Sequence, residues 1–261
     1  MKIHQFKNAS CSQRGFTLLE LIISFSIGTV VLLAASSLIV SSAQSRKVIK
    51  HTAELQEESI FVSHLLKQQL AQAGYRSLQP TTGASTAIPV PAVSTHYPAV
   101  TGRWAAGQLI NVIGGALLYR FDGASRPDGS PDNSIFDCLG NPIPAGTIIE
   151  SSISVTNNSL VCTVGTNTRL LVDGSQGVRV EQLQMTLGVD TDGDDEIDQT
   201  VSTALATQAD FRNTRNLTMR LLLATEDNTI RYNQTYFFNG PTTATDNRVR
   251  LESVVSVALR H

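Results

Sequence analysis

The stretch RGFTLLELIISFSIGTVVLL, which runs from Arg14 to Leu33, is apolar except for one acid near its start, Glu20. Glu20 is also the only charged residue between Phe16 and Val40. An apolar run of this length can cross the hydrocarbon core of a bilayer as a helix. A carboxylate inside such a run is unfavourable unless an opposite charge lies near it. Membrane anchoring alone therefore does not explain the presence of Glu20.

The helical pattern continues past the apolar run. No Pro or Gly interrupts the chain from Thr29 to Ala73, and Gly74 is a natural stop. Apolar residues recur on one face at helical spacing, with Lys and Glu around them: Val48, Leu55, Val62, Leu66, Leu70 and Ala73. The sequence therefore predicts one long helix from Phe16 to Ala73. Its first half is apolar all round and its second half is amphipathic.

The pattern beyond the helix changes to β. Residues Gln79 to Thr101 are rich in Pro, Thr, Ser and Ala and contain no Asp, Glu, Lys or Arg, which predicts an irregular connection. The segment VTNNSLV predicts a hairpin, because Asn157 and Asn158 tolerate positive φ. The predicted strands are Leu109–Ile113, Ala116–Phe121, Thr147–Val155, Leu160–Val164, Arg169–Val172, Val178–Leu187, Leu217–Ala224, Ile230–Phe238 and Val249–Leu259. The expected fold class is α+β, a long N-terminal helix followed by an antiparallel β-rich domain.

The charges ahead of the apolar run predict its orientation. Lys2, Lys7 and Arg14 are basic, and Met1 to Gly15 contains no acid. Positive residues beside a membrane helix stay on the cytoplasmic side, so the remainder of the chain is expected to point outward. The whole chain has a net charge of −2 and no Lys/Arg run, so nothing indicates contact with nucleic acid.

The three cysteines lie in different segments. Cys11 is in the basic leader, whereas Cys138 and Cys162 are in the polar body. If the body is exported, Cys138 and Cys162 can form a disulfide in an oxidising compartment. Two unpaired thiols are the alternative.

Three ordinary interpretations of the opening stretch leave Glu20 unexplained or conflict with the unbroken helix. They are a secretory signal cleaved near Leu33–Ser37, a plain membrane anchor, and a chance acid in a core helix. Cleavage after Gly15 would instead create an α-amino group on Phe16, one helical turn from Glu20. An amine about 4 Å from the carboxylate returns roughly 4 kcal/mol at an effective dielectric of 20. Glu20 would then drive helices to assemble in register.

The motif GFTLLE after a basic leader resembles the type III signal of type IV pilins and of type II secretion pseudopilins. This resemblance implies that a membrane aspartyl prepilin peptidase cuts after Gly15 and N-methylates Phe16. The chain departs from many major pilins because it lacks a proline midway along the apolar helix.

Four further patches resemble the PilW family of minor pilins: AELQEESIFVSHLLKQQLAQAGYRS at Ala53–Ser77, FDCLGNPI around Cys138, Val180–Asp198, and the ending VRLESVVSVALRH. The resemblance implies a type IV pilin-like fold and a low-abundance structural subunit that helps to initiate the pilus at or near its tip. The implied partners are other minor pilins, the major pilin, a tip adhesin, the prepilin peptidase and the inner-membrane assembly platform. The implied location is a single pass through the inner membrane with the C-terminal domain in the periplasm, and later the pilus, where adhesion or twitching motility would follow.

Two alternatives stay open, a pseudopilin of a type II secretion system and a membrane-anchored extracytoplasmic binding module. The expected organisation of the chain is a cleaved leader at 1–15, a transmembrane half-helix at 16–42, an amphipathic half-helix at 43–74, an irregular connection at 75–106 and a β-rich domain at 107–261.

The segment DTDGDDEID, from Asp190 to Asp198, is a candidate calcium loop. Alternating carboxylates in a tight loop can supply the six to eight oxygens that Ca²⁺ takes. The candidate ligands are Asp190, Asp192, Asp194, Asp198 and the backbone carbonyl of Glu196. The pattern is not an EF-hand, and a solvated acidic turn without metal is the alternative.

No catalytic pattern stands out. The five His residues have no metal-ligand spacing, and no nucleophile elbow or glycine-rich phosphate loop accompanies them. An enzyme is not expected, and no cofactor is required apart from the candidate Ca²⁺.

Overall fold

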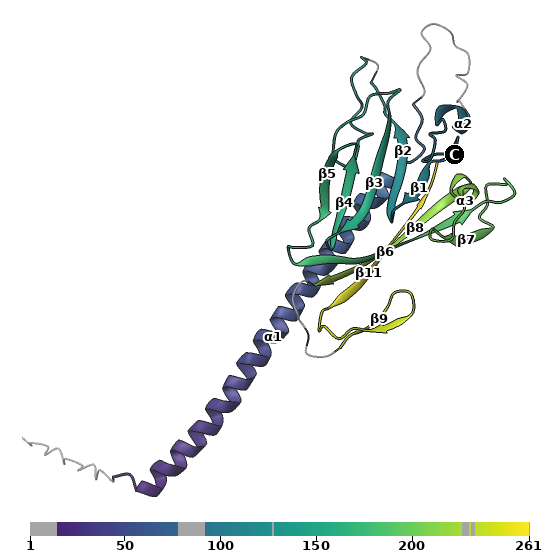
Figure 1. Cartoon of the computed structure of the whole chain (residues 1–261). Coiled ribbons are helices and arrows are strands. Elements are labelled where there is room, and N and C mark those ends of the chain that lie inside the picture. Colours follow the sequence, from purple (N-terminus) through teal and green to yellow (C-terminus); the bar gives the residue numbers. More distant parts are fainter. Residues whose placement is uncertain (1–14, 78–91, 127, 226–229, 231–232, 261) are drawn as a thin grey trace, which may run out of the picture. The chain divides into compact units, whose positions relative to one another are not determined.

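The computed structural model describes residues 15–77, 92–126, 128–225, 230 and 233–260 (Figure 1). The predicted leader lies outside the described residues except for Gly15, as does 78–91 of the predicted connection. The chain divides after Val48 into two compact units, which are described separately. Helix α1, Leu18–Leu70, contributes residues to both.

In the first unit, α1 is apolar on every side. Phe16 is 83 % exposed, and large apolar side chains up to Val40 are also exposed, among them Leu19, Phe25, Leu33 and Leu38. A helix on the surface of a soluble protein normally buries an apolar stripe against a core and exposes a polar face. This segment has no polar face, and its apolar side chains are exposed all round. The helix is long and apolar enough to cross a membrane.

In the second unit, α1 is amphipathic. Leu55, Val62, Leu66 and Leu70 are at most 1 % exposed and belong to the hydrophobic core with strands from both sheets. These residues were expected on the apolar face, which confirms the second half of the predicted helix. Val48, predicted on the same face, is the last residue of the first unit and is half-buried.

The helix ends three residues before the predicted end. Gln72 and Ala73 donate to carbonyls three residues back, at 3.2 and 3.0 Å, so a tighter turn replaces α geometry. Gly74 follows with φ +78° and donates its N–H to the Arg120 carbonyl at 3.0 Å. A Cβ at Gly74 would lie 2.3 Å from the Arg260 carbonyl oxygen, so only glycine fits this stop.

The β domain contains two antiparallel sheets and a small hairpin (Figure 1). The first sheet is a meander in sequence order: β1 (Ile110–Ile113), β2 (Ala116–Asp122), β3 (Ile148–Thr156), β4 (Ser159–Val164) and β5 (Asn167–Val172). The second has the order β11-β8-β6-β7, from β11 (Arg250–Ala258), β8 (Thr214–Thr225), β6 (Val178–Val189) and β7 (Gln199–Ser202). The hairpin pairs β9 (Thr235–Phe237) with β10 (Pro241–Thr243).

Strand β6 joins the two sheets into one core. Within its own sheet β6 pairs along β8, and it also lies against strands β3, β4 and β5 of the first sheet. Val180 N–H donates to the Asn158 carbonyl at 2.7 Å, which ties β6 to the β3–β4 turn. The predicted class, a long N-terminal helix followed by an antiparallel β domain, is confirmed.

The turn at Asn157 and Asn158 has φ values of 51° and 60°, as the two-residue hairpin requires. The predicted strand Ile230–Phe238 is wrong in extent, because the described part of it is a strand only over Thr235–Phe237. Strands β7 and β10 and the short helices α2 (Val93–His96) and α3 (Gln208–Arg212) were not predicted. Both missed strands are three or four residues long and largely exposed, so they carry little apolar periodicity.

Candidate functional site

The start of α1 brings the predicted processing residues together. Gly15, Phe16 and Thr17 are outside the helix, which begins at Leu18, two residues later than predicted. All three are exposed. A Cβ built at Gly15 meets no atom of the described residues within 4 Å, so packing among those residues does not need a glycine there.

Thr17 caps the helix, a role that was not predicted from the sequence. Its Oγ1 accepts the backbone N–H of Glu20 at 3.2 Å, and its carbonyl accepts Leu21 N–H at 3.1 Å. Those two bonds are the side-chain and backbone signatures of an N-cap residue. The segment TLLE has the spacing of a capping box, Thr followed three residues later by Glu, and this spacing could have revealed the helix start.

Glu20 lies in the first turn of α1 with an exposed side chain. The unpaired N–H groups of a helix N-terminus favour a negative charge in that turn. Its own backbone N–H is satisfied by Thr17, so the cap and the carboxylate use different atoms.

Four hydroxyls of the apolar half-helix are satisfied locally. Each donates to a carbonyl three or four residues earlier, at 2.7–2.9 Å: Ser26, Thr29, Ser36 and Ser37. Polar groups inside a hydrocarbon layer need such internal partners. The described residues from Phe16 to Val40 therefore present one charge, Glu20, on an otherwise apolar surface.

Residues 11–36 match the family model described as the prokaryotic N-terminal methylation motif.

That match spans Gly15, Phe16, Thr17 and Glu20 and covers a short N-terminal part of the chain. A search of curated proteins finds no match. Among solved structures, the type IV-like pilin TTHA1219 from Thermus thermophilus is similar, with 16 % sequence identity and a TM-score of 0.43. The alignment covers 78 % of this chain and 96 % of that one.

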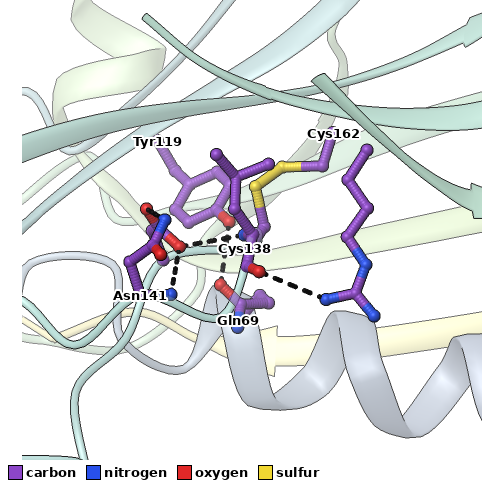
Figure 2. The surroundings of a disulfide bond; sticks show 8 residues. Gln69, Tyr119, Cys138, Asn141 and Cys162 are labelled. Atoms are coloured by element: carbon purple, nitrogen blue, oxygen red, sulfur yellow. Dashed lines mark hydrogen bonds between the residues drawn. A yellow bond between two sulfur atoms is a disulfide. The ribbon is translucent and has the colours of Figure 1, made fainter. Parts of the chain in front are cut away.

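Cys138 and Cys162 form a disulfide, the pairing expected for an exported chain (Figure 2). Their Cα atoms are 6.3 Å apart, within the ordinary range for a disulfide, and both residues are buried. Cys162 lies on β4, whereas Cys138 lies in the loop between β2 and β3. The bond therefore fixes a long loop to the first sheet.

Asp137 shapes the loop around Cys138. Its Oδ1 accepts the backbone N–H groups of Leu139 and Asn141 at 2.9 and 2.8 Å, and its Oδ2 accepts the Asn141 amide at 3.1 Å. Beside the disulfide, Tyr119 donates to the side chain of Gln69 on α1 at 3.2 Å (Figure 2). Helix, sheet and disulfide loop thus meet in one buried cluster.

The acidic loop between β6 and β7 is organised around Asp190, which is 2 % exposed. Its Oδ2 accepts the Nε and Nη2 groups of Arg215 at 3.0 and 2.8 Å, and its Oδ1 accepts Gly193 N–H at 2.6 Å. Arg215 also pairs with Asp195 at 2.7 Å. These bonds, led by Arg215, lower the pKa of Asp190. Arg215 was absent from the predicted site because it is 25 residues away along the chain.

Asp192 and Asp198 have opposite surroundings. Asp198 accepts both the N–H and the hydroxyl of Thr191 at 2.7 Å, and these bonds lower its pKa. Asp192 accepts the N–H of Asp194, but the negative charges of Asp194 and Asp198 outweigh this bond and raise the pKa of Asp192. The loop thus holds one carboxylate whose charge is poorly compensated.

Three of the five predicted metal ligands come together. Asp190, Asp192 and Asp194 offer carboxylate oxygens within 4.8 Å of one another, a spacing that suits oxygens around one Ca²⁺ at 2.3–2.6 Å. Glu196 and Asp198 are not in this group. The three carboxylates have the chemistry that Ca²⁺ prefers and could supply three of its six to eight oxygens, while Arg215 shares the Asp190 carboxylate. A bound ion would offset part of the negative charge of the loop and hold these three carboxylates together, with no redox role.

Proposed function

We propose that this chain is a minor pilin of a type IV pilus, a structural subunit without enzymatic activity. The observation that carries the proposal is the methylation motif over residues 11–36, whose Gly15–Phe16 bond lies just outside a helix that is apolar all round. Prepilin peptidase would cleave after Gly15 and N-methylate Phe16. The half-helix would then anchor the subunit in the inner membrane, with the β domain in the periplasm, before it enters the pilus.

Glycine at position 15 supports processing by an external enzyme. The described residues leave open space at the Gly15 Cβ position, so packing among them does not call for a glycine there. A residue without a side chain lets the backbone enter a narrow active site in extended form. Such an enzyme would leave the new α-amino group on Phe16, within reach of a carboxylate in the first helical turn.

Glu20 would guide assembly. In an apolar layer its carboxylate is costly alone and tolerable beside the α-amino group of Phe16 on its own or a neighbouring subunit. When the amine belongs to a neighbouring subunit, the correct register satisfies both charges, whereas a misplaced subunit leaves both unpaired. The PilW-like patches at Ala53–Ser77, around Cys138 and at Val180–Asp198 support a role at or near the tip. The partners would be other minor pilins, the major pilin, a tip adhesin and the assembly platform.

A calcium ion bound by Asp190, Asp192 and Asp194 is a second proposal. Their spacing favours it. The ion would order the β6–β7 loop of an extracytoplasmic domain.

Two other functions would use the same apolar helix. A type II secretion pseudopilin would differ in its partner genes, and an anchored binding module would not need Glu20.

The first experiment measures the intact mass of the protein from its native membrane. We expect a chain that begins at N-methylated Phe16, with two cysteines that alkylate only after reduction. A chain that retains residues 1–15 would be a simple anchored protein, and the pilin proposal would then be wrong.

The second experiment compares Glu20→Gln with Glu57→Gln, which changes an exposed carboxylate in the amphipathic part of α1. We expect Glu20→Gln to insert into the membrane normally and to reduce pilus initiation at least about tenfold, a loss equivalent to about 1.4 kcal/mol. Glu57→Gln should initiate pili as the unmodified protein does. Normal piliation by Glu20→Gln would favour the anchored binding module.

A further inference from the structure

We propose that Thr17 is a positioning residue for cleavage of the Gly15–Phe16 bond. Its hydroxyl fixes where α1 begins, and so keeps the scissile bond in the non-helical chain that a peptidase can take up. The inference rests on the proposed function, because it assumes processing after Gly15.

The contacts at the helix start carry this inference. Thr17 Oγ1 accepts Glu20 N–H at 3.2 Å, and residues 15–17 are non-helical while Leu18 is the first helical residue. The first N–H groups of a helix have no partner within it, and a hydroxyl that accepts one of them sets the terminus at its own residue. The scissile bond lies one residue before this cap.

The position of the cap matters because of what cleavage requires. Water must add to the Gly15 carbonyl carbon, and the C–N bond to Phe16 must break, which leaves a Gly15 carboxylate and a protonated Phe16 amine. Inside a helix, that carbonyl would accept the N–H of Leu19, and both groups of the scissile bond would be crowded by the next turn. Exposed, non-helical residues at 15 and 16 leave both groups open to the enzyme.

Without the hydroxyl, the helix start is no longer held at Leu18 and can extend through Phe16 and Gly15. Loss of an N-cap changes helix-end populations by a factor of about five, equivalent to about 1 kcal/mol. The cap uses the backbone N–H of Glu20 and leaves its carboxylate for assembly, so the two functions can be separated by mutation.

The test uses full-length precursor in detergent micelles with purified prepilin peptidase, and measures kcat/KM for release of the leader. Thr17→Val keeps the side-chain shape but removes the acceptor, and we expect cleavage about fivefold slower. Thr17→Ser and Thr17→Asn restore an acceptor and should stay within about twofold of the unmodified chain. Thr29→Val is the matched control, since the Thr29 hydroxyl donates to the Ser26 carbonyl in the same helix and caps nothing.

Amide exchange in the same micelles gives an independent readout. Thr17→Val should slow exchange at Leu19 N–H, which gains the Gly15 carbonyl as its acceptor when the helix extends, whereas Thr29→Val should leave it unchanged. Cleavage of Thr17→Val at the unmodified rate would overturn the inference. So would equally slow cleavage of Thr17→Ser and Thr17→Val, because the peptidase would then read the whole threonine side chain. Unmodified chain that is not cut after Gly15 would refute the proposed function itself.

Discussion

Arg250 holds two carboxylates where β6, β11 and the loop after β10 meet. Its Nε and Nη2 donate to Glu181 at 2.7 and 3.0 Å, and its Nη1 and Nη2 donate to Asp246 at 2.7 and 2.6 Å. The Arg250 side chain is 6 % exposed and lies over the Tyr236 ring. A buried guanidinium with two partners depends on both, because loss of either leaves its charge less compensated.

The pH dependence of stability should report the Asp246 contact. Hydrogen bonds from Arg250 lower the pKa of Asp246 from 3.8 to about 2. A lowered pKa stabilises the fold above the ordinary value, and this contribution is lost as the pH falls from about 4 towards 2. Because the Asp246 side chain is 38 % exposed, we expect only about 1 kcal/mol after allowance for solvent screening.

Urea unfolding followed by the fluorescence of Trp104, the single tryptophan, measures this difference. Asp246→Asn should be less stable than the unmodified protein at pH 6 by about 1 kcal/mol and equally stable near pH 2. Glu57→Gln, on the exposed face of α1, is the control. Parallel pH curves for Asp246→Asn and the unmodified protein would show that the ion pair contributes nothing.

Among the elements, those with strong periodicity could be predicted from sequence. The apolar stripe from Leu55 to Ala73 predicted the buried face of α1, and the Asn157–Asn158 pair predicted a hairpin with positive φ. Seven of the predicted strands agree closely with β1–β6 and β11, and β8 is longer than predicted. Local patterns sufficed because these elements present one face to the core.

Contacts between distant segments could not be predicted in this way. Arg120 is 3 % exposed and donates to the carbonyls of Tyr97, Pro98, Ala105 and Gln108, so it anchors much of the segment before β1. Burial lowers its pKa to about 10. In the sequence it is one arginine in the predicted strand Ala116–Phe121, with nothing nearby in the chain to indicate its partners. Arg215 on β8 is similar, because β8 must first pair with β6 before this side chain can reach Asp190 in the acidic loop.

The calcium site proposed in the β6–β7 loop predicts that Ca²⁺ stabilises the fold. At about 10 mM Ca²⁺, well above the roughly 0.1–1 mM dissociation constants of extracellular modules, binding should raise the free energy of unfolding by up to about 2.7 kcal/mol. EDTA should reverse the gain. Asp192→Asn removes one of the three clustered carboxylates and should weaken binding at least about tenfold, whereas Asp128→Asn, outside the loop, should not. Equal stability in Ca²⁺ and EDTA would mean that Arg215 alone compensates the loop.

At the scale of the whole molecule, the residues of one helix lie in two different environments. Leu66 is 0 % exposed in the second unit, whereas Leu38 is 71 % exposed in the first. The same substitution at the two positions separates the two contributions. Removal of a buried leucine side chain costs its transfer free energy plus that of the cavity, about 2–5 kcal/mol, whereas an exposed one takes nothing from the core.

We therefore expect Leu66→Ala to lower the free energy of unfolding of the full chain in detergent by about 3 kcal/mol, and Leu38→Ala to change it by less than about 0.5 kcal/mol. Trp104 fluorescence again follows the β domain. Leu38→Ala should act instead on retention in membranes or in filaments, where its side chain meets lipid or another subunit. A Leu38→Ala variant that destabilises the domain as much as Leu66→Ala would show that the apolar half-helix packs on its own chain, which would remove the basis for assigning it to the membrane and the pilus.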